Sequence, residues 1–239
     1  MKHSSKSILK ATVSVFALAT MLSACGSDSP VTSTTGSVVI GVGVTPNPAS
    51  PGNNGPDGPV AVGAVSAIQM TSAEVVISRI RVKSVGEDTL DFNSTTPIVV
   101  NLDLTGAQQS LGTLTLPAGS YDKTIFKIDQ LDSLDGTVYT NNPNMQDISI
   151  RVAGYVNGFV DSTFLWTTTL DEEQVFQHTT PFTVVAGQTT NLSFHFDNSK
   201  WFMDQNNAMI DPRDGQNQSQ IENNIKNAFD ITESQAGIQ

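Results

Sequence analysis

The chain has 239 residues with 12 basic and 23 acidic side chains, which gives a formal net charge of −11 at pH 7. This balance disfavours nucleic acid and anionic lipid headgroups as partners, because both carry charges that an acidic surface repels. Cys25 is the single cysteine, so intrachain disulfides are excluded and a hydrophobic core has to stabilise the fold.

Residues 1–24 have the composition of an export signal. The first ten residues carry lysines and no acid, and the apolar stretch Ala11–Ala24 that follows is too short for a permanent transmembrane helix. The end of this stretch, Leu22-Ser23-Ala24-Cys25, resembles the lipobox of bacterial lipoproteins. The resemblance implies that Cys25 is acylated, with palmitate for example, and begins the mature protein. The alternatives are an ordinary secretory signal with a cysteine nearby by chance, or a free buried thiol.

An acylated Cys25 would hold the protein at a membrane, because several acyl chains together anchor stably. Gly26 rather than Asp follows Cys25. By resemblance to the sorting rule of Gram-negative lipoproteins, this favours the outer membrane. The sequence therefore predicts a lipid-anchored protein of the cell envelope, and leaves open whether its body faces the periplasm or the cell surface.

Residues 25–59 are rich in Ser, Thr, Gly, Pro, Asn and Asp, which is typical of a flexible linker. Such a linker would hold the folded body away from the lipid surface. Within it, the apolar run Val38–Val44 has two interpretations that the sequence leaves open. The run is either a first strand or a weakly ordered part of the stalk.

Residues 60–202 have the pattern of a strand-rich body. In Ile98–Gly106, apolar and polar residues alternate with the period of two that indicates a half-buried antiparallel strand. Another strand is predicted over Ala73–Val82. The residues of this strand that we expect to face the core are Val76, Ile80 and Val82.

Turn residues separate further predicted strands. Pro117-Ala118-Gly119 interrupts one run, and Ala186–Thr189 is expected to be a hairpin loop. The side chains expected to point inward after these turns are Phe126, Ile128, Leu192, Phe194 and Phe196. Many short strands with little helical pattern predict an all-β fold, an antiparallel β-sandwich with one short C-terminal helix.

Residues 203–239 are predicted to form an acidic loop and that short helix. Ser219 and Glu222 have the spacing of a capping box, which would start the helix at Gln220. The apolar stripe of the helix is Ile221, Ile225 and Phe229. The helix either packs across an end or edge of the sandwich or presents this stripe to a partner.

The order of these segments resembles a known group of proteins. The resemblance rests on Leu116–Tyr121, on the later Ala186–Thr189 turn before a strand of alternating aromatics, and on Trp201-Phe202 soon after. Over roughly residues 60–202, the pattern is similar to bacterial lipoproteins with a transthyretin-like (prealbumin-like) or carboxypeptidase-regulatory-like β-sandwich domain of unknown function. The resemblance implies a fold and a cell-envelope context, and it carries over no catalytic residue.

The acidic loop offers candidate metal ligands: Asp197, Asp204, Asp211 and Asp214. Calcium takes six to eight oxygen ligands, which carboxylates, amides and backbone carbonyls of such a loop can supply. The spacing does not match an EF-hand loop, so the alternative is that these residues form turns through bonds to their own backbone. The segment Asp129–Asp135 is a weaker candidate, and no other cofactor is expected.

No motif for catalysis is present. His178 and His195 lack the spacing or the cysteines of a zinc site, and the sequence has no G-x-S-x-G element and no phosphate-binding glycine loop. Four aromatic residues are candidates for stacking on sugar rings: Tyr139, Tyr155, Trp166 and Trp201. Both tryptophans are more simply explained as packing residues.

These observations predict a non-enzymatic binding or adhesion module, with a protein or glycan of the cell surface as its partner. The alternative is a structural or accessory subunit of an envelope complex, which predicts an exposed apolar edge strand or an outward helix stripe. The third hypothesis is a carboxylate- or metal-dependent hydrolase. It predicts that Asp197, Asp204 and Asp211 converge with His195 in one cleft.

Overall fold

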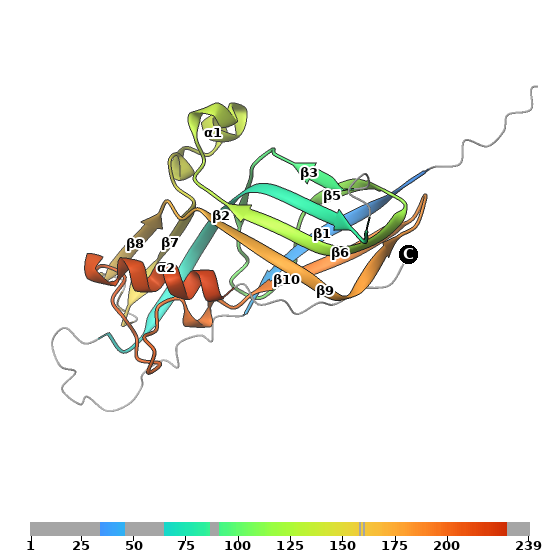
Figure 1. Ribbon diagram of the computed structural model, residues 1–239. Coiled ribbons are helices and arrows are strands. Elements are labelled where there is room, and N and C mark those ends of the chain that lie inside the picture. The colour runs from blue at the N-terminus through green and yellow to red at the C-terminus, as the bar shows by residue number, and fades with distance from the viewer. Residues whose placement is uncertain (1–33, 46–64, 87–90, 158, 160, 229–239) are drawn as a thin grey trace, which may run out of the picture. The chain divides into compact units, whose positions relative to one another are not determined.

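The computed structural model describes residues 34–45, 65–86, 91–157, 159 and 161–228. Cys25 and Phe229 lie outside these ranges. The described residues form mainly β-strands in two sheets, with a short helix near their C-terminal end (Figure 1). The predicted all-β fold with mostly antiparallel sheets is confirmed. No helix within the described ranges is long and apolar enough to cross a membrane.

One sheet has three strands and the other has seven. The three-stranded sheet has the order β10–β1–β5, with β1 at Thr35–Val44, β5 at Gln109–Pro117 and β10 at Thr189–Phe196. The seven-stranded sheet comprises β2 (Ile68–Ser84), β3 (Phe92–Ser94), β4 (Ile98–Asn101), β6 (Gly119–Ile128), β7 (Ile150–Val156), β8 (Thr163–Thr168) and β9 (Glu172–Val184). Among these strands, β1 and β10 are the parallel pair.

The larger sheet is built on β2. β7 pairs with the first half of β2 and β6 with the second half, whereas β4 and β3 pair along the opposite edge. The register shifts between residues 70 and 72 and again between residues 77 and 79. At such a bulge one extra residue turns all following side chains to the other face of the sheet.

The second bulge corrects one prediction about the core. Val75 and Ile77 before the bulge share the main core with Ile80 and Val82 after it. The expectation that Val76 faces the same way as Ile80 and Val82 is wrong, because an even spacing across a bulge places side chains on opposite faces. Val76 is fully buried on the other side of the sheet.

A single large core fills the space between the two sheets. The ring of Phe126 meets that of Phe194 edge to face at 4.6 Å and that of Phe176 at 5.4 Å between centroids. The inward residues predicted for β6 and β10 are all buried: Phe126, Ile128, Leu192, Phe194 and Phe196. Burial of such side chains is the main favourable term in folding.

β1 lies inside the segment 25–59 that was expected to be a flexible linker. Of the two interpretations of Val38–Val44, the structure shows the strand. Its inward residues Val38, Ile40, Val42 and Val44 are at most 1 % exposed. β1 is central, because it pairs with β10 on one side and with β5 on the other. The linker prediction failed here because the valines and isoleucine are covered by strands distant in sequence.

The two predicted turns are corners between the sheets. Pro117–Gly119 joins β5 of the small sheet to β6 of the large one, and Val185–Gln188 joins β9 of the large sheet to β10 of the small one. The hairpin expected at Ala186–Thr189 is therefore wrong, because β10 pairs with β1 and β9 pairs with β6. The turn residues were recognised correctly, but turn chemistry does not say which sheet the next strand enters.

The segment between β6 and β7 forms a small lobe. It contains the short helix α1 (Thr137–Asn141) between two 3-10 turns, Ser133–Asp135 and Pro143–Met145. Leu131 and Met145 of this lobe are buried against Val76 on the outside of the large sheet. The weaker metal candidate Asp129–Asp135 lies here, where the Asp132 and Asp135 side chains form a capping box around the first turn.

The C-terminal helix, α2, spans Gln218–Asn227. The predicted helix is confirmed, but its capping box is wrong. The helix begins at Gln218 with Asn217 as its N-cap, so Ser219 lies inside the helix and is not its cap. The Glu222 carboxylate instead accepts hydrogen bonds from Thr168 Oγ1 (2.5 Å) and Gln218 Nε2 (2.9 Å). Ile221 and Ile225 are fully buried in the main core. The stripe therefore faces the sandwich, and the alternative of an outward stripe is wrong for these two residues.

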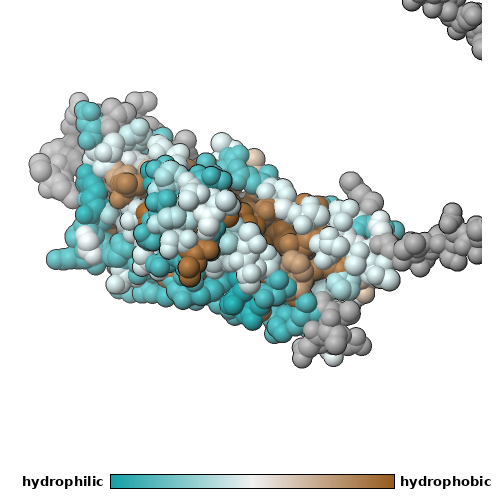
Figure 2. Space-filling model, turned by 90° about the horizontal axis from the view of Figure 1, so that it is seen from above, coloured by the Kyte–Doolittle hydropathy of each residue, from teal (hydrophilic) through white to brown (hydrophobic). Residues whose placement is uncertain are grey.

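Figure 2 shows one face of the molecule, on which a strip of apolar residues lies among hydrophilic ones. This view looks down on the molecule from the top of Figure 1, where α1 lies highest and β3 below it. Phe92 of β3 and Leu111 and Leu114 of β5 are partly buried apolar residues that pack against the core. β5 is an edge strand of its sheet.

Candidate functional site

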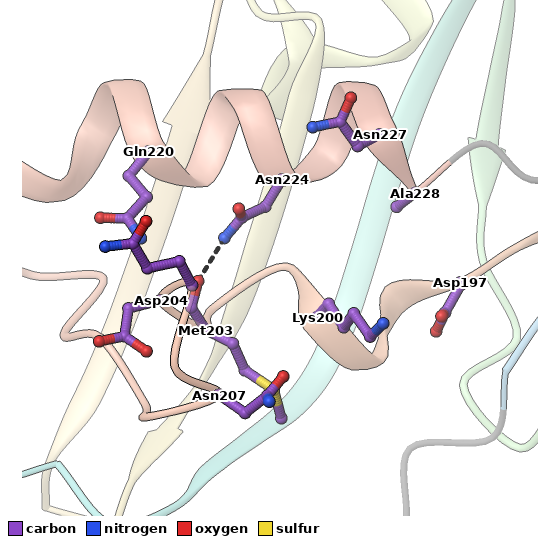
Figure 3. Close-up of a pocket in the computed structure, with 10 residues that line it drawn as sticks. Asp197, Lys200, Met203, Asp204, Asn207, Gln220, Asn224, Asn227 and Ala228 are labelled. Atoms are coloured by element: carbon purple, nitrogen blue, oxygen red, sulfur yellow. Dashed lines mark hydrogen bonds between the residues drawn. The ribbon is translucent and has the colours of Figure 1, made fainter.

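A polar pocket lies at the end of the sandwich where β1 and β10 both finish. The Thr45 N–H donates to the Phe196 carbonyl (3.0 Å), and the next residue, Asp197, donates its N–H to the Ala228 carbonyl at the end of α2 (2.9 Å). The chain from Asp197 to α2 thus folds back under the helix. The space between the helix and this loop is the pocket (Figure 3).

The pocket has a volume of about 390 Å³, which suits a small ligand. Its lining is dominated by amide side chains, with two carboxylates, one ammonium group and one thioether. The lining residues are Asp197, Lys200, Met203, Asp204, Gln205, Asn207, Gln220, Asn224, Asn227 and Ala228. Figure 3 shows that Gln220, Asn224 and Asn227 come from α2, and that the other labelled side chains come from the loop below it and from Ala228.

Asn224 fixes the distance between the helix and the loop. Its Nδ2 donates to the Trp201 carbonyl (3.1 Å) and the Met203 carbonyl (2.6 Å), the second of which is drawn in Figure 3. Trp201 is 1 % exposed and belongs to the main core. Because one amide holds two backbone carbonyls of a loop anchored in the core, the pocket wall is pre-organised.

Four other amides of the pocket have unused hydrogen-bonding capacity: Gln205, Asn207, Gln220 and Asn227. Their side chains make no hydrogen bond to another described residue, and the Lys200 ammonium likewise has no ion pair among the described residues. Each amide offers both a donor and an acceptor. The pocket therefore presents several free donors and acceptors next to one apolar side chain, Met203.

Asp197 supports the start of the loop. Its carboxylate accepts hydrogen bonds from the Ser199 N–H (3.0 Å) and hydroxyl (2.5 Å) and so caps the 3-10 turn Asn198–Lys200. Burial raises the pKa of Asp197, but the hydrogen bonds from Ser199 and Thr45 and the nearby Lys200 charge outweigh it and leave the pKa below its usual value. Asp197 is thus an ionised structural carboxylate at neutral pH.

Asp204 shapes the lower wall of the pocket. Its Oδ1 accepts the backbone N–H groups of Asn206 and Ala208, both at 2.8 Å. These bonds, with that of Ala208 the largest effect, lower the pKa of Asp204. The turn places the Asn207 amide at the pocket.

Asp211 and Asp214 lie outside the pocket lining. Asp211 pairs with the Arg213 guanidinium (2.7 Å), which lowers the pKa of Asp211, and Arg213 also reaches the Ser162 hydroxyl (2.8 Å). Asp214 accepts the Gln216 N–H and caps the turn before α2. Both carboxylates therefore serve the local turns, as the alternative interpretation of the acidic loop expected.

The structure brings together only part of the predicted metal or hydrolase site. Asp197 and Asp204 share the pocket, whereas Asp211 and Asp214 do not. Within the described ranges no three His, Cys, Asp or Glu side chains are grouped closely enough to hold a metal ion. Calcium binding by Asp197, Asp204, Asp211 and Asp214 stays a prediction, and the position of Cys25 lies outside the described residues.

The two histidines among the described residues, His178 and His195, both contact threonine hydroxyls. His195 Nε2 lies 2.9 Å from Thr45 Oγ1 beside the pocket but does not line it. His178 is 5 % exposed, and its Nε2 lies 2.9 Å from Thr124 Oγ1 inside the sheet. The convergence of His195 with the three aspartates, which the hydrolase hypothesis predicted, is not found.

The two tryptophan candidates for sugar stacking are buried in the core, and the two tyrosine candidates are half-buried, Tyr155 on β7 and Tyr139 in the lobe around α1. Trp166 and Trp201 are 3 % and 1 % exposed and belong to the main core, as the packing interpretation predicted. Tyr139 belongs to the lobe around α1, where its hydroxyl donates to Asp147 (3.5 Å).

Sequence reasoning missed the amide residues of the pocket. Gln205, Asn207, Gln220 and Asn227 come from two segments and have no motif spacing. The available indication was compositional, because Asn and Gln are frequent between residues 205 and 227. Asn and Gln are also frequent in ordinary turns, so this composition alone does not predict a site.

Comparison with known families gives one match. A family model described as a domain of unknown function (DUF4382) matches residues 59–212. No curated protein matches the chain. No solved structure matches it either. The match ends before α2, so it covers the loop side of the pocket and not the helix side.

Proposed function

The chain belongs to the DUF4382 family, and from the site just described we propose that it is a lipid-anchored lipoprotein of the cell envelope that acts by binding, without catalysis. The observation that carries the proposal is the pre-organised pocket under α2 with its free amides. The ligand we propose is a small, neutral saccharide. The lipid is carried by Cys25, in the outer membrane of a Gram-negative bacterium.

The choice of ligand follows from the chemistry of the lining. The hydroxyl groups of a sugar both donate and accept, as do the side-chain amides of Gln205, Asn207, Gln220 and Asn227. The lining carries two carboxylates and one ammonium, so an anionic ligand gains little there. Met203 provides the apolar contact that the C–H face of a sugar ring needs. A binding role fits such a site, because orientation by a few polar groups in a concave pocket is how small ligands are held.

The ligand proposal is tested with a panel of neutral and acidic soluble oligosaccharides, by ligand-observed NMR and by calorimetry. Gln220→Ala and Asn227→Ala each remove one free amide of the pocket. Each variant should weaken binding of a neutral sugar by roughly five- to tenfold, the effect of a hydrogen bond worth about 1 kcal/mol. Asn223→Ala is the matched control, because Asn223 is exposed on the same helix and does not line the pocket.

Two outcomes would contradict the ligand proposal. One is that no neutral sugar binds. The other is that Asn223→Ala weakens binding as much as the pocket variants do, which would place the ligand elsewhere on the helix. Selective binding of acidic sugars would replace the proposed ligand class by an anionic one.

The anchor is tested separately by metabolic labelling with palmitate. The natural chain should take up label and partition with membranes, whereas Cys25→Ser should do neither, because the thioether forms at that sulfur. Label in the Cys25→Ser variant would refute the anchor. The secretory-signal alternative predicts an unlabelled natural chain.

The second candidate function is a structural or accessory subunit of an envelope complex. It is favoured by the exposed apolar strip seen in Figure 2, together with the position of β5 at a sheet edge. An edge strand can pair with another chain. The subunit hypothesis predicts a stable complex in membrane extracts that Leu111→Glu disrupts and that Gln220→Ala leaves intact.

A further inference from the structure

The charged groups that line the pocket do not balance. The lining carries the carboxylates of Asp197 and Asp204 and the ammonium of Lys200, which give it a formal charge of −1. The other lining side chains are uncharged. The width of a pocket of about 390 Å³ is comparable with the screening length of about 8 Å at physiological ionic strength, so a charged ligand inside it interacts with all three groups.

Asp197 and Lys200 lie together at the Ala228 end of the pocket. The Asp197 N–H donates to the Ala228 carbonyl at 2.9 Å, and Figure 3 shows the Lys200 ammonium directed toward Asp197. Burial raises the pKa of Asp197, and the Lys200 charge is one of the effects that lower it, together with the hydrogen bonds from Ser199 and Thr45. The charge of Asp197 is therefore offset within the protein itself.

Asp204 has no cation of its own. It lies toward the Gln220 end of the pocket (Figure 3), and among the described residues its carboxylate forms hydrogen bonds with uncharged groups and no ion pair. The hydrogen bonds, with that of the Ala208 N–H the largest effect, lower the pKa of Asp204, so this carboxylate is ionised at neutral pH. The unbalanced negative charge of the lining is thus the charge of Asp204.

One oxygen of the Asp204 carboxylate has spare capacity to bind a ligand. Oδ1 accepts the N–H groups of Asn206 and Ala208 at 2.8 Å, whereas Oδ2 receives one long bond from Asn206 Nδ2 at 3.4 Å. An ionised carboxylate is an acceptor only, and each of its oxygens has room for about two hydrogen bonds. Asp204 Oδ2 can therefore accept from a hydroxyl or an ammonium group, and it repels a carboxylate.

From this arrangement we propose that Asp204 is the specificity-determining residue of the pocket, and that its uncompensated charge excludes acidic saccharides in favour of neutral ones. The inference rests on the proposed saccharide-binding function and adds the residue that selects among saccharides. The free amides of the pocket bind the hydroxyl groups of any saccharide, so they do not provide this selection. Discrimination requires a repulsive group placed against the unwanted ligand, and the Asp204 carboxylate is that group.

The test compares three sugars of nearly equal size at pH 7: glucose is neutral, glucuronate carries a negative charge and glucosamine carries a positive one. Ligand-observed NMR with the full chain gives the dissociation constant of each sugar. The measured quantity is the ratio of the dissociation constant of a charged sugar to that of glucose. In the natural chain the glucuronate ratio should be about three to ten, the effect of two unit charges about 6 Å apart at an effective dielectric constant of about 40–80.

Asp204→Asn removes the charge and keeps an oxygen that can accept the backbone N–H groups. In this variant the glucuronate ratio should fall by about three- to tenfold, to near one, and the glucosamine ratio should rise by a similar factor. Shifts of opposite sign report the charge, because a purely structural role would weaken all three sugars alike and leave both ratios unchanged. Lys200→Gln is the complementary variant, which should raise the glucuronate ratio because the lining loses its positive charge.

Asp214→Asn is the matched control. The Asp214 carboxylate also supports a turn of this loop, by accepting the Gln216 N–H at 2.9 Å, but Asp214 does not line the pocket. Both ratios in this variant should equal those of the natural chain. Raising the salt concentration from 0.01 to 1 M should bring the glucuronate ratio of the natural chain toward one, because the screening length falls from about 30 Å to about 3 Å.

Unchanged ratios in Asp204→Asn would overturn the inference and leave saccharide binding in place. Equal shifts in Asp214→Asn would overturn it as well, because the preference would then follow the charge of the whole protein. If Asp204→Asn does not fold, the Lys200→Gln ratio decides, and an unchanged value overturns the inference. Failure of all three sugars to bind the natural chain would overturn the proposed function of the pocket itself.

Discussion

β1 is buried in the core although it lies within residues 25–59, which have the composition of a linker. This contrast leads to a specific prediction about stability. If β1 is a structural strand, its inward and outward residues should differ strongly in their effect on stability. Ile40 is fully buried between β10 and β5, where it pairs with Leu192 and Gly112. Its neighbour Val39 lies on the outer face and is partly exposed. Ile40→Ala and Val39→Ala are therefore a matched pair.

The magnitude follows from the atoms removed. Ile40→Ala deletes the equivalent of three methylene groups, each worth about 0.8 kcal/mol when buried. The cavity left between two sheets adds to this loss, so the free energy of unfolding should fall by about 3 kcal/mol, within the usual range of about 2–5 kcal/mol. Val39→Ala removes partly exposed atoms on the outer face and should cost less than about 1 kcal/mol.

The assay is urea unfolding of the chain from Gly26 to Gln239, followed by tryptophan fluorescence. Trp166 and Trp201 are both buried in the core that β1 completes, so their emission reports on its loss. With an m value near 3 kcal/mol/M, Ile40→Ala should lower the midpoint by about 1 M. Val39→Ala should shift it by no more than a third of that.

Equal and small shifts for the two variants would refute the assignment of β1 to the core. Such a result would restore the stalk interpretation of Val38–Val44.

Three further predictions concern single positions. Gly36→Ala should lower the free energy of unfolding by about 1–3 kcal/mol, because its Cβ would collide with the corner after β9. Gly41→Ala is the control, because a Cβ at Gly41 would make only ordinary contacts and should be tolerated. Urea unfolding measures both variants. Asp211→Asn should lower the free energy of unfolding by up to about 1 kcal/mol at pH 7 and by less at pH 2. Arg213 lowers the pKa of Asp211 below 3.8, so the stabilisation is present above that value and is lost as the pH falls through the folded-state pKa. A loss of stability that does not change with pH in unfolding experiments would contradict this prediction. Asn224→Ala should lower the free energy of unfolding by about 1–3 kcal/mol, because the Trp201 and Met203 carbonyls lose their hydrogen-bond donor. Thermal unfolding measures this loss, and an unchanged melting temperature would show that water replaces the donor fully.

Much of the fold was predictable from alternation alone. In β10, Leu192, Phe194 and Phe196 alternate with polar residues and all point inward, because a strand with one buried face has to keep a period of two. The helix stripe Ile221 and Ile225 was equally clear, since the spacing of four matches the turn of a helix. These features need only neighbours in sequence to be recognised.

Features that depend on distant segments were missed or misassigned. The bulge in β2 reversed the facing of Val76, and nothing in the local sequence marks the extra residue. The capping box at Ser219 and Glu222 failed, because the helix begins at Gln218 and Ser219 lies inside it, while the Glu222 carboxylate accepts a hydrogen bond from the Thr168 hydroxyl of β8. Local spacing shows neither a hydrogen bond from a distant strand nor the residue at which a helix begins.

The sequence by itself determined the all-β class, the main inward faces and the short C-terminal helix, because each is set by local periodicity and hydrophobicity. The tertiary structure alone decided that β1 is the central strand of its sheet, that the corners Pro117–Gly119 and Val185–Gln188 switch between sheets, and that amides from two segments meet in one pocket. The physical reason is the same in all three cases. Strand pairing and pocket formation join residues far apart in the chain, and backbone hydrogen bonds between strands carry no sequence code of their own.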